Sequence, residues 1–287
     1  MPYKYFQCPD KQTVEIENCL KECRMGSRCL SIPTLRLIAE QRPWAGKPST
    51  TQLLKGTREA YLHIVKDDLV MAPKDQLFRI LGTKGHAVLE QYTENELSEE
   101  RLSSDVATGA FDLYDPESKT LYDYKTWGSY RVAMALGIEM VEVDTGEVYK
   151  TGAKKGQPKT RKEPKFTGNI DNRETELQLN HYRIMLEEAG FPVENIIVEA
   201  IVRDGGTMAA TSRGITENGY LIPIRRLDDA EVIAYFTGKA EKLKQALETG
   251  SCEKCTAEER WNDRKCQKYC DVAKHCEYGR QFMEVEK

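Results

Sequence analysis

Cysteine is placed in this chain in a way that limits what its two ends can fold into. All nine cysteines lie either before residue 30 or after residue 250. One spacing, C-x10-C-x3-C-x5-C, is formed by Cys8, Cys19, Cys23 and Cys29, and again by Cys255, Cys266, Cys270 and Cys276. If the thiols were merely small buried hydrophobic groups, nothing would produce the same spacing twice. The pattern therefore predicts a structural metal site of four thiolates at each end, with Cys252 left over.

Length and composition favour a globular protein of the cytoplasm. The 287 residues are enough for a full hydrophobic core. There is no apolar run near the ~18 residues of a membrane span, and the start, MPYKYFQCPD, lacks the apolar core of a secretory signal. We therefore expect no membrane association, and a reducing compartment in which cysteines bind metal more readily than they form disulfides.

Hydrophobic periodicity predicts a mixed α/β fold. Helices are expected at about 49–65, 75–92, 172–189 and 228–248, and strands at 106–114, 120–127, 196–203 and 220–224. Interleaved strands and helices indicate a mixed central sheet flanked by helices. The expected division is a cysteine module at 1–34, a core at 35–250 and a second cysteine module at 251–287.

The hairpin expected at 106–127 carries residues suited to metal-dependent chemistry. Asp112 lies near the end of its first strand, and Asp123 and Lys125 lie two residues apart on the second. A period of two places Asp123 and Lys125 on one face of the sheet. Carboxylates bind Mg²⁺ or Mn²⁺, and a nearby lysine can act on the attacking water or on a phosphate. For D-x-K alone, a solvated hairpin face would be the better interpretation.

Three further short motifs flank this hairpin. Gly82 and His86 lie upstream on a predicted helix, Gly109 precedes Asp112, and Gln178 and Tyr182 lie at i and i+4 on the 172–189 helix. In this order the four motifs resemble those of the RecB-like branch of the PD-(D/E)xK nuclease superfamily. The resemblance covers about residues 49–247.

The resemblance implies a restriction-endonuclease-like core that hydrolyses DNA phosphodiester bonds with Mg²⁺ or Mn²⁺. It implies that His86, Asp112, Asp123 and the backbone carbonyl of Tyr124 ligate the metal. Lys125 would orient or deprotonate the water and neutralise developing charge. Gln178 and Tyr182 would support the site or contact the nucleic-acid backbone, whereas neighbouring His181 is expected to point away and be exposed.

The metals of the cysteine modules are a separate question. Four local sulfurs suit Zn²⁺, which we expect at the N-terminal module. Some RecB-like nucleases, including a CRISPR-associated group and the AddB type, carry a 4Fe-4S cluster held by one cysteine before the core and three after it. This chain has a full set at each end, so the C-terminal module is left as a zinc site or a 4Fe-4S site.

A basic segment departs from the family pattern. Lys150 to Lys165 contains seven Lys or Arg and a single acid, Glu163, in a chain of net charge −4. Its glycines and prolines predict a loop. We expect Lys154, Lys155, Arg161 and Lys162 to contact phosphates, the alternative being a solvated loop that only aids solubility.

The sequence thus favours a metal-dependent DNA nuclease acting on single- or double-stranded DNA. Protein partners in a recombination, phage or CRISPR complex are also expected. Two alternatives stay open: a catalytically silent nucleic-acid-binding or scaffold module with metal-stapled ends, and a nuclease that acts on RNA.

Overall fold

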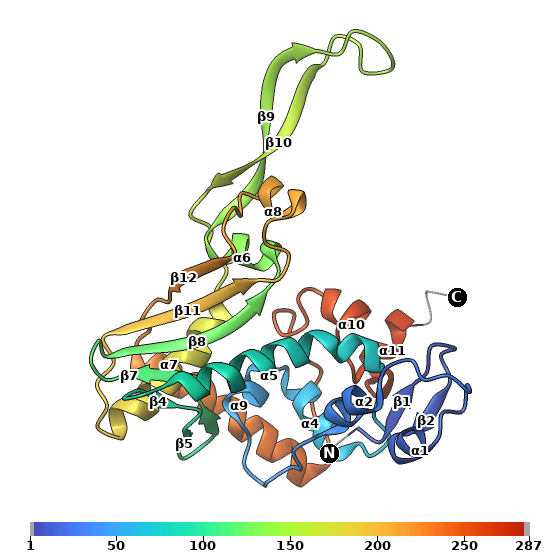
Figure 1. Ribbon diagram of the computed structural model, residues 1–287, viewed down its shortest axis with the longest axis vertical. Helices are drawn as coiled ribbons and strands as arrows, with labels where there is room; N and C mark the ends of the chain where they lie inside the picture. The colour runs from blue at the N-terminus through green and yellow to red at the C-terminus, as the bar shows by residue number, and fades with distance from the viewer. Residues whose placement is uncertain (1–2, 284–287) are drawn as a thin grey trace. The chain divides into compact units, whose positions relative to one another are not determined.

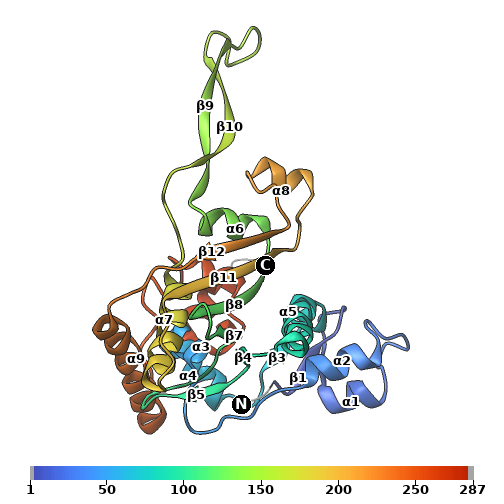
Figure 2. The ribbon, with the colours of Figure 1, turned by 60° about the vertical axis from the view of Figure 1, so that its left-hand side comes forward.

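The computed structural model describes residues 3–283, which form two compact units (Figures 1 and 2). Unit 1 comprises the described residues up to 92, residues 101–110, and those from 228 onward. Unit 2 comprises residues 93–100 and 111–227. The predicted division at residues 34 and 250 follows the sequence alone, and it stays a prediction.

Unit 2 is built on a five-stranded sheet in the order β12-β11-β8-β7-β4. β11 pairs with β8 in parallel, and the other three pairings are antiparallel, so the expected mixed sheet is confirmed. The elements of unit 2 are β4 (Leu97–Ser98), β7 (Leu113–Asp115), β8 (Thr120–Trp127), α6 (Ser129–Ala135), β9 (Ile138–Val148), β10 (Pro158–Phe166), α7 (Arg173–Glu188), β11 (Asn195–Val202), α8 (Met208–Ser212) and β12 (Gly219–Pro223).

The predicted hairpin is only partly correct. Its turn forms as expected, because the Asp115 carboxylate accepts a hydrogen bond from the backbone N–H of Glu117 at 2.9 Å. The predicted strand at 106–114 is divided, however. β6 belongs to unit 1, where it pairs with β5, and only β7 joins the sheet of unit 2. Asp112 lies at the break between them.

Helix α7 packs against β8 and β11 and is almost wholly buried along its length. The Arg183 guanidinium is 0% exposed and donates to Asn180 Oδ1, to Glu187 Oε2 at 2.8 Å and to the carbonyl oxygen of Leu227. Because a buried charge is costly unless it is paired, these contacts hold the helix in one register. The predicted helix at 172–189 is confirmed. The expectation that His181 is exposed is wrong, since it is 3% exposed.

The basic segment forms one strand and most of the end loop of a two-stranded arm, so the prediction of a loop is wrong over half of it. β9 and β10 pair antiparallel from Ile138 with Phe166 to Val148 with Pro158, and only residues 149–157 form a loop. The arm projects from unit 2 beside α6 (Figure 1). Gly214 packs against its base, where a Cβ at that position would lie 3.0 Å from Pro164 Cβ.

Unit 1 brings together both ends of the chain. A three-stranded sheet, β2-β1-β3, packs with helices around buried Phe6, Leu35 and Ile38. The elements of unit 1 are β1 (Tyr5–Gln7), β2 (Thr13–Glu15), α1 (Ile16–Lys21), α2 (Ile32–Ala39), α3 (Thr50–Leu54), α4 (Thr57–Val65), β3 (Val70–Met71), η1 (Pro73–Gln76), α5 (Leu77–Leu89), η2 (Glu90–Tyr92), β5 (Arg101–Ser103), β6 (Thr108–Ala110), α9 (Asp229–Thr249), α10 (Arg264–Lys268), η3 (Ala273–His275) and α11 (Glu277–Met283).

Two helix predictions in unit 1 meet different outcomes. The helix at 228–248 is confirmed as α9, which begins where the Asp228 carboxylate accepts from the Glu231 N–H and ends at Gly250 with φ 69°. The single helix expected at 49–65 is instead two, α3 and α4, with a break at Lys55 and Gly56. Periodicity alone does not reveal the break, because buried Leu53, Ala60 and Ile64 keep a helical spacing across it.

We predict that His181 makes the stability of unit 2 sensitive to acid. Burial lowers the pKa of this histidine from 6.5 to about 4. Below pH 6.5 the unfolded chain takes up a proton that the folded chain binds only near pH 4, so stability falls as the pH drops between these values. The loss is about 1.4 kcal/mol per pH unit, and about 3 kcal/mol at most.

His181→Gln should flatten this part of the stability curve, measured by urea unfolding between pH 7 and pH 4. The slope with pH is the diagnostic quantity, since the substitution also changes packing at every pH. An identical slope in both proteins would contradict the assignment.

Candidate active site

Strand β8 positions the two central residues of the predicted site. Asp123 and Lys125 lie on one face of the sheet, and Asp123 Oδ2 lies 2.6 Å from Lys125 Nζ. Their parallel neighbours in β11 are Val198 and Ala200, both 0% exposed. The shared face expected from the two-residue spacing is therefore observed, and it is the buried face of the sheet.

The Asp123 carboxylate is unusually placed for a charged group. Asp123 is 2% exposed, and no hydrogen bond of acceptable geometry satisfies its Oδ2 atom, although the Lys125 ammonium is close. A buried carboxylate oxygen without a hydrogen bond is costly. The Lys125 ammonium offsets part of that cost, and a metal cation at the same oxygen would offset more of it.

Electrostatics keep Lys125 in its ammonium form. Burial lowers the pKa of Lys125, but the carboxylates of Asp123 and then Asp112 outweigh burial, so the pKa is raised overall. Lys125 therefore carries a positive charge while both carboxylates face it.

Asp112 lies one residue before β7, and continuing the β7–β8 register places it opposite Asp123. Its Oδ2 atom accepts a hydrogen bond of 2.7 Å from the backbone N–H of Tyr124. This bond fixes the backbone at Tyr124, whose carbonyl is one of the predicted ligands.

Glu99 is a candidate ligand that sequence reasoning missed. Its backbone N–H donates to the Asp112 carbonyl oxygen, and carboxylate oxygens of the two residues lie within 4.8 Å of each other. The signal in the sequence is weak, because Glu99 follows a two-residue strand and belongs to no motif. Asp112 and Glu99 supply hard oxygen atoms of the kind that Mg²⁺ and Mn²⁺ prefer. These two carboxylates thus fit a divalent cation, whereas Asp123 Oδ2 contacts Lys125 and, among the described residues, is not part of this close group.

Helix α7 brings Gln178 and Tyr182 together, as their i, i+4 spacing predicted. Gln178 Nε2 donates to the Tyr182 hydroxyl at 3.4 Å. Tyr182 is only 4% exposed. Of the two predicted roles, support of the site is the one that this burial favours.

His86 lies on α5 and therefore in unit 1, whereas the other predicted ligands belong to unit 2. Its ligation of the metal stays a prediction.

The N-terminal cysteines converge on one cavity, which Cys8, Cys19, Cys23 and Cys29 all line. Burial raises the pKa of Cys19, and the neighbouring thiols of this set raise it further. Thiolates brought this close repel one another, and a bound cation would relieve the repulsion.

The C-terminal cysteines also share one cavity. Cys255, Cys266, Cys270 and Cys276 line a second cavity, and burial raises the pKa of Cys270 to about 12. Arg58 donates to Cys276 Sγ at 3.8 Å, so a cation already faces this set. Among the described residues, no cysteine belongs to a group of three ligand atoms that lie within 4.8 Å of one another. The sulfurs of each set thus share a cavity without the tight packing of four ligands around one zinc.

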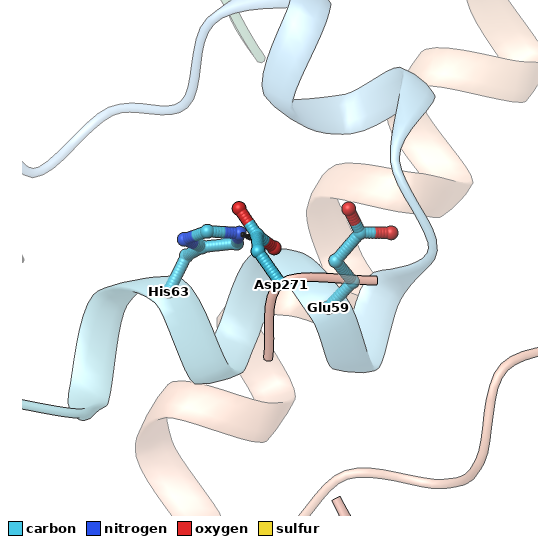
Figure 3. A group of neighbouring side chains, drawn as sticks. All are labelled: Glu59, His63 and Asp271. Atoms are coloured by element: carbon cyan, nitrogen blue, oxygen red, sulfur yellow. Dashed lines mark hydrogen bonds and ion pairs between the residues drawn. The ribbon is translucent and has the colours of Figure 1, made fainter. Parts of the chain in front are cut away.

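A second group with metal-ligand chemistry lies in unit 1. Glu59 and His63 of α4 lie beside Asp271 of the C-terminal segment (Figure 3). His63 Nε2 lies 2.8 Å from Asp271 Oδ1, and the Tyr3 hydroxyl donates to the other oxygen. Lys265 Nζ lies 2.7 Å from Glu59.

These contacts describe a polar clasp, meaning Tyr3, Glu59, His63, Lys265 and Asp271, that ties the two ends of the chain to α4. Burial would raise the pKa of Asp271, but His63 and Tyr3 outweigh it and lower the pKa to about 2. A divalent cation at Glu59 would have to displace Lys265. We therefore interpret the clasp as structural.

Comparisons with known proteins add little to this geometry. No protein-family model matches the sequence, and no curated protein matches it significantly. The crystal structure of SSO0001 aligns with 92% of this chain and 96% of its own, at 15% identity and a TM-score of 0.44. A phage-related exonuclease from Haemophilus somnus 129PT aligns with 71% of this chain and 96% of its own, at 12% identity and a TM-score of 0.38. TM-scores below 0.5 do not establish a common fold.

Within residues 3–283, no helix combines the length and the hydrophobicity needed to cross a bilayer.

We predict that Asp271→Asn weakens the clasp without changing the metal content of the protein. The stabilisation by Asp271 is present above pH 3.8 and is lost as the pH falls towards 2, because its folded pKa is the lower one. Its side chain is 39% exposed, so after allowance for solvent screening the loss at pH 7 should be about 1 kcal/mol. Urea unfolding and metal analysis together test this. A loss of bound metal in the variant would instead identify the group as a metal site.

We predict that Gly56→Ala disrupts the C-terminal cysteine module. A Cβ at Gly56 would lie 2.5 Å from Cys255 Sγ, and Gly56 has an ordinary φ of −56°, so the effect is purely steric. The variant should lose about 1–3 kcal/mol of stability and part of its bound metal, as should Cys270→Ser. Gly238→Ala on α9 is the matched control, because a Cβ added there would have nothing within 4 Å, and it should not destabilise the protein. Equal metal content in all four proteins would contradict the prediction.

Proposed function

We propose that this protein is a metal-dependent nuclease that hydrolyses phosphodiester bonds in DNA. The observation that carries the proposal is the buried Asp123 carboxylate, with Lys125 Nζ at 2.6 Å and an oxygen that no hydrogen bond satisfies. Structural ion pairs on a sheet usually lie at the surface or are fully hydrogen-bonded. A buried carboxylate held against a lysine whose pKa is perturbed by burial and by neighbouring carboxylates is typical of a catalytic site.

In the proposed mechanism, Asp112 and Asp123 would hold Mg²⁺ or Mn²⁺ together with the Tyr124 carbonyl, His86 and, as an added ligand, Glu99. The bound cation would act as a Lewis acid and lower the pKa of water. Asp112 fixes the local backbone through its bond to the Tyr124 N–H. Lys125, as an ammonium group, orients the water and neutralises charge that develops on the phosphate.

Gln178 and Tyr182 have a positioning role in this proposal. Their contact faces inward from α7, the helix that packs on β8 and β11, so they support the strand that carries Asp123. The cysteine modules would hold Zn²⁺ at the N-terminal set and either Zn²⁺ or a 4Fe-4S cluster at the C-terminal set. Their role would be to stabilise unit 1, in which both lie.

A silent nucleic-acid-binding module is the alternative from a different class. Such a module has no use for a buried aspartate paired with a lysine, because a buried ion pair usually stabilises a fold less than well-packed apolar residues do. A nuclease that acts on RNA is the second alternative. The cleavage experiment that follows distinguishes it from a DNA nuclease.

Purified protein should cleave single-stranded or duplex DNA only when Mg²⁺ or Mn²⁺ is added, and RNA is tested in parallel. Asp123→Ala and Lys125→Ala should each reduce the cleavage rate by about 10²–10³-fold, because each removes a group that acts in the transition state. Lys119→Ala is the matched control from the same hairpin, since its surface pair with Glu194 lies in the turn region, and it should leave the rate unchanged. Cleavage that persists in the Asp123 variant would reject the proposal.

A further inference from the structure

The charge of the β9–β10 arm is not spread evenly. Strand β9 carries Glu139, Glu142, Asp144 and Glu147, and β10 carries Lys159, Arg161, Lys162 and Lys165 together with Glu163. The loop at the tip, residues 149–157, contains Lys150, Lys154 and Lys155 and no acid. The paired strands, which we call the stem, are thus close to neutral, and the positive charge is concentrated at the tip.

Each basic residue of the stem has an acidic partner, either in an ion pair or at the opposite position of the strand register. Lys159 Nζ lies 2.8 Å from Glu147, and Arg161 forms an ion pair with Glu163. Lys162 lies directly opposite Glu142 in the register, as Lys165 lies opposite Glu139. Cross-strand pairs of opposite charge stabilise a ribbon and leave little net field around it. Arg161 and Lys162, two of the predicted phosphate contacts, therefore belong to a compensated surface.

The tip, in contrast, is held in a defined shape that exposes its lysines. The Tyr149 N–H donates to the Gln157 carbonyl at 3.0 Å, and the Gly156 N–H donates back to the Tyr149 carbonyl at 2.9 Å. Gly152 and Gly156 adopt φ values of 80° and 83°, which glycine allows without strain. All three tip lysines are exposed.

The arm also carries its tip far from the strand that bears Lys125. The 11 residues of β9, at about 3.3 Å each, span about 36 Å. Duplex DNA rises 3.4 Å per base pair, so this reach corresponds to about ten base pairs. The base of the arm lies just beyond α6, which follows β8 directly.

We propose that the tip lysines bind the phosphate backbone of duplex DNA about ten base pairs beyond the base of the arm, and so at a distance from the site at Asp123. The proposal rests on the nuclease function and names its substrate: a duplex that continues well past the point of cleavage. The neutral stem lets DNA pass alongside without binding it, and the tip makes the remote contact.

An anionic membrane surface and a second copy of the chain fit the arm less well. Membrane-bound segments insert Trp, Phe or Leu, and the tip has none of these. Its Tyr149 ring lies under the ammonium groups of Lys154 and Lys159, with distances of 5.8 and 6.0 Å to the ring centroid. Two arms pairing edge to edge about a two-fold axis would place like charges opposite each other.

The test measures binding of full-length protein to duplex DNAs of about 8 and about 30 base pairs and, in parallel, to anionic phospholipid vesicles. No divalent metal is added, so that the DNA stays intact. Lys154→Gln with Lys155→Gln is the tip variant. Lys242→Gln with Lys244→Gln on α9 is the matched control, with the same change in charge at two exposed lysines outside the arm.

On the long duplex the tip variant should bind roughly tenfold more weakly at 0.1 M salt, and its slope of log affinity against log salt should be shallower by up to about 1.8. On the short duplex it should bind like the wild type. The control variant should match the wild type on both.

Three results would overturn the proposal: a tip variant equal to the control on the long duplex, an equal loss at both lengths, or a loss confined to anionic phospholipid vesicles. Cleavage assays distinguish failure of the remote-contact proposal from failure of the nuclease proposal. Metal-dependent cleavage with no effect of the tip variant rejects only the remote contact. Tip-dependent binding of long DNA without any cleavage rejects only the nuclease.

Discussion

The buried pair of Asp123 and Lys125 is the interaction on which the candidate site depends. A carboxylate with 2% exposure would be costly on its own, and the ammonium at 2.6 Å offsets part of that cost. The pair stays in place because β8 is a central strand, held by β11 on one side and by β7 on the other. The sheet and α7 together therefore supply the rigid, water-poor setting in which a cation and a phosphate could be held.

Unit 1 is stabilised by different interactions. Its strands are only two or three residues long. Polar groups supplement its hydrophobic contacts. They form two cavities lined by cysteines and the clasp that includes Tyr3, His63 and Asp271. The clasp and the C-terminal cavity join segments that lie more than 200 residues apart in the sequence. The arm is stabilised in yet another way. Acidic residues of one strand lie opposite basic residues of the other.

Much of the candidate site was predictable because its signals are local. The D-x-K spacing placed Asp123 and Lys125 on one face, and the i, i+4 spacing placed Gln178 against Tyr182. Predictions failed where the outcome depended on distant partners. His181 is buried because α7 is enclosed on nearly every side, which no stripe of hydrophobic residues could indicate. The segment 158–166 forms a strand because β9 lies beside it, and its own composition favours a loop.

The sequence by itself determined the mixed α/β class, the repeated cysteine spacing, and the pairing of acid with lysine on one strand. These properties depend on residue order within a few positions, so they can be read without knowing the fold. Only the tertiary structure decided that Glu99 lies beside Asp112, that each cysteine set shares one cavity, and that the basic segment stands out as an arm. Each of these joins residues through strand register or through contact between distant segments, and neither is encoded in local periodicity.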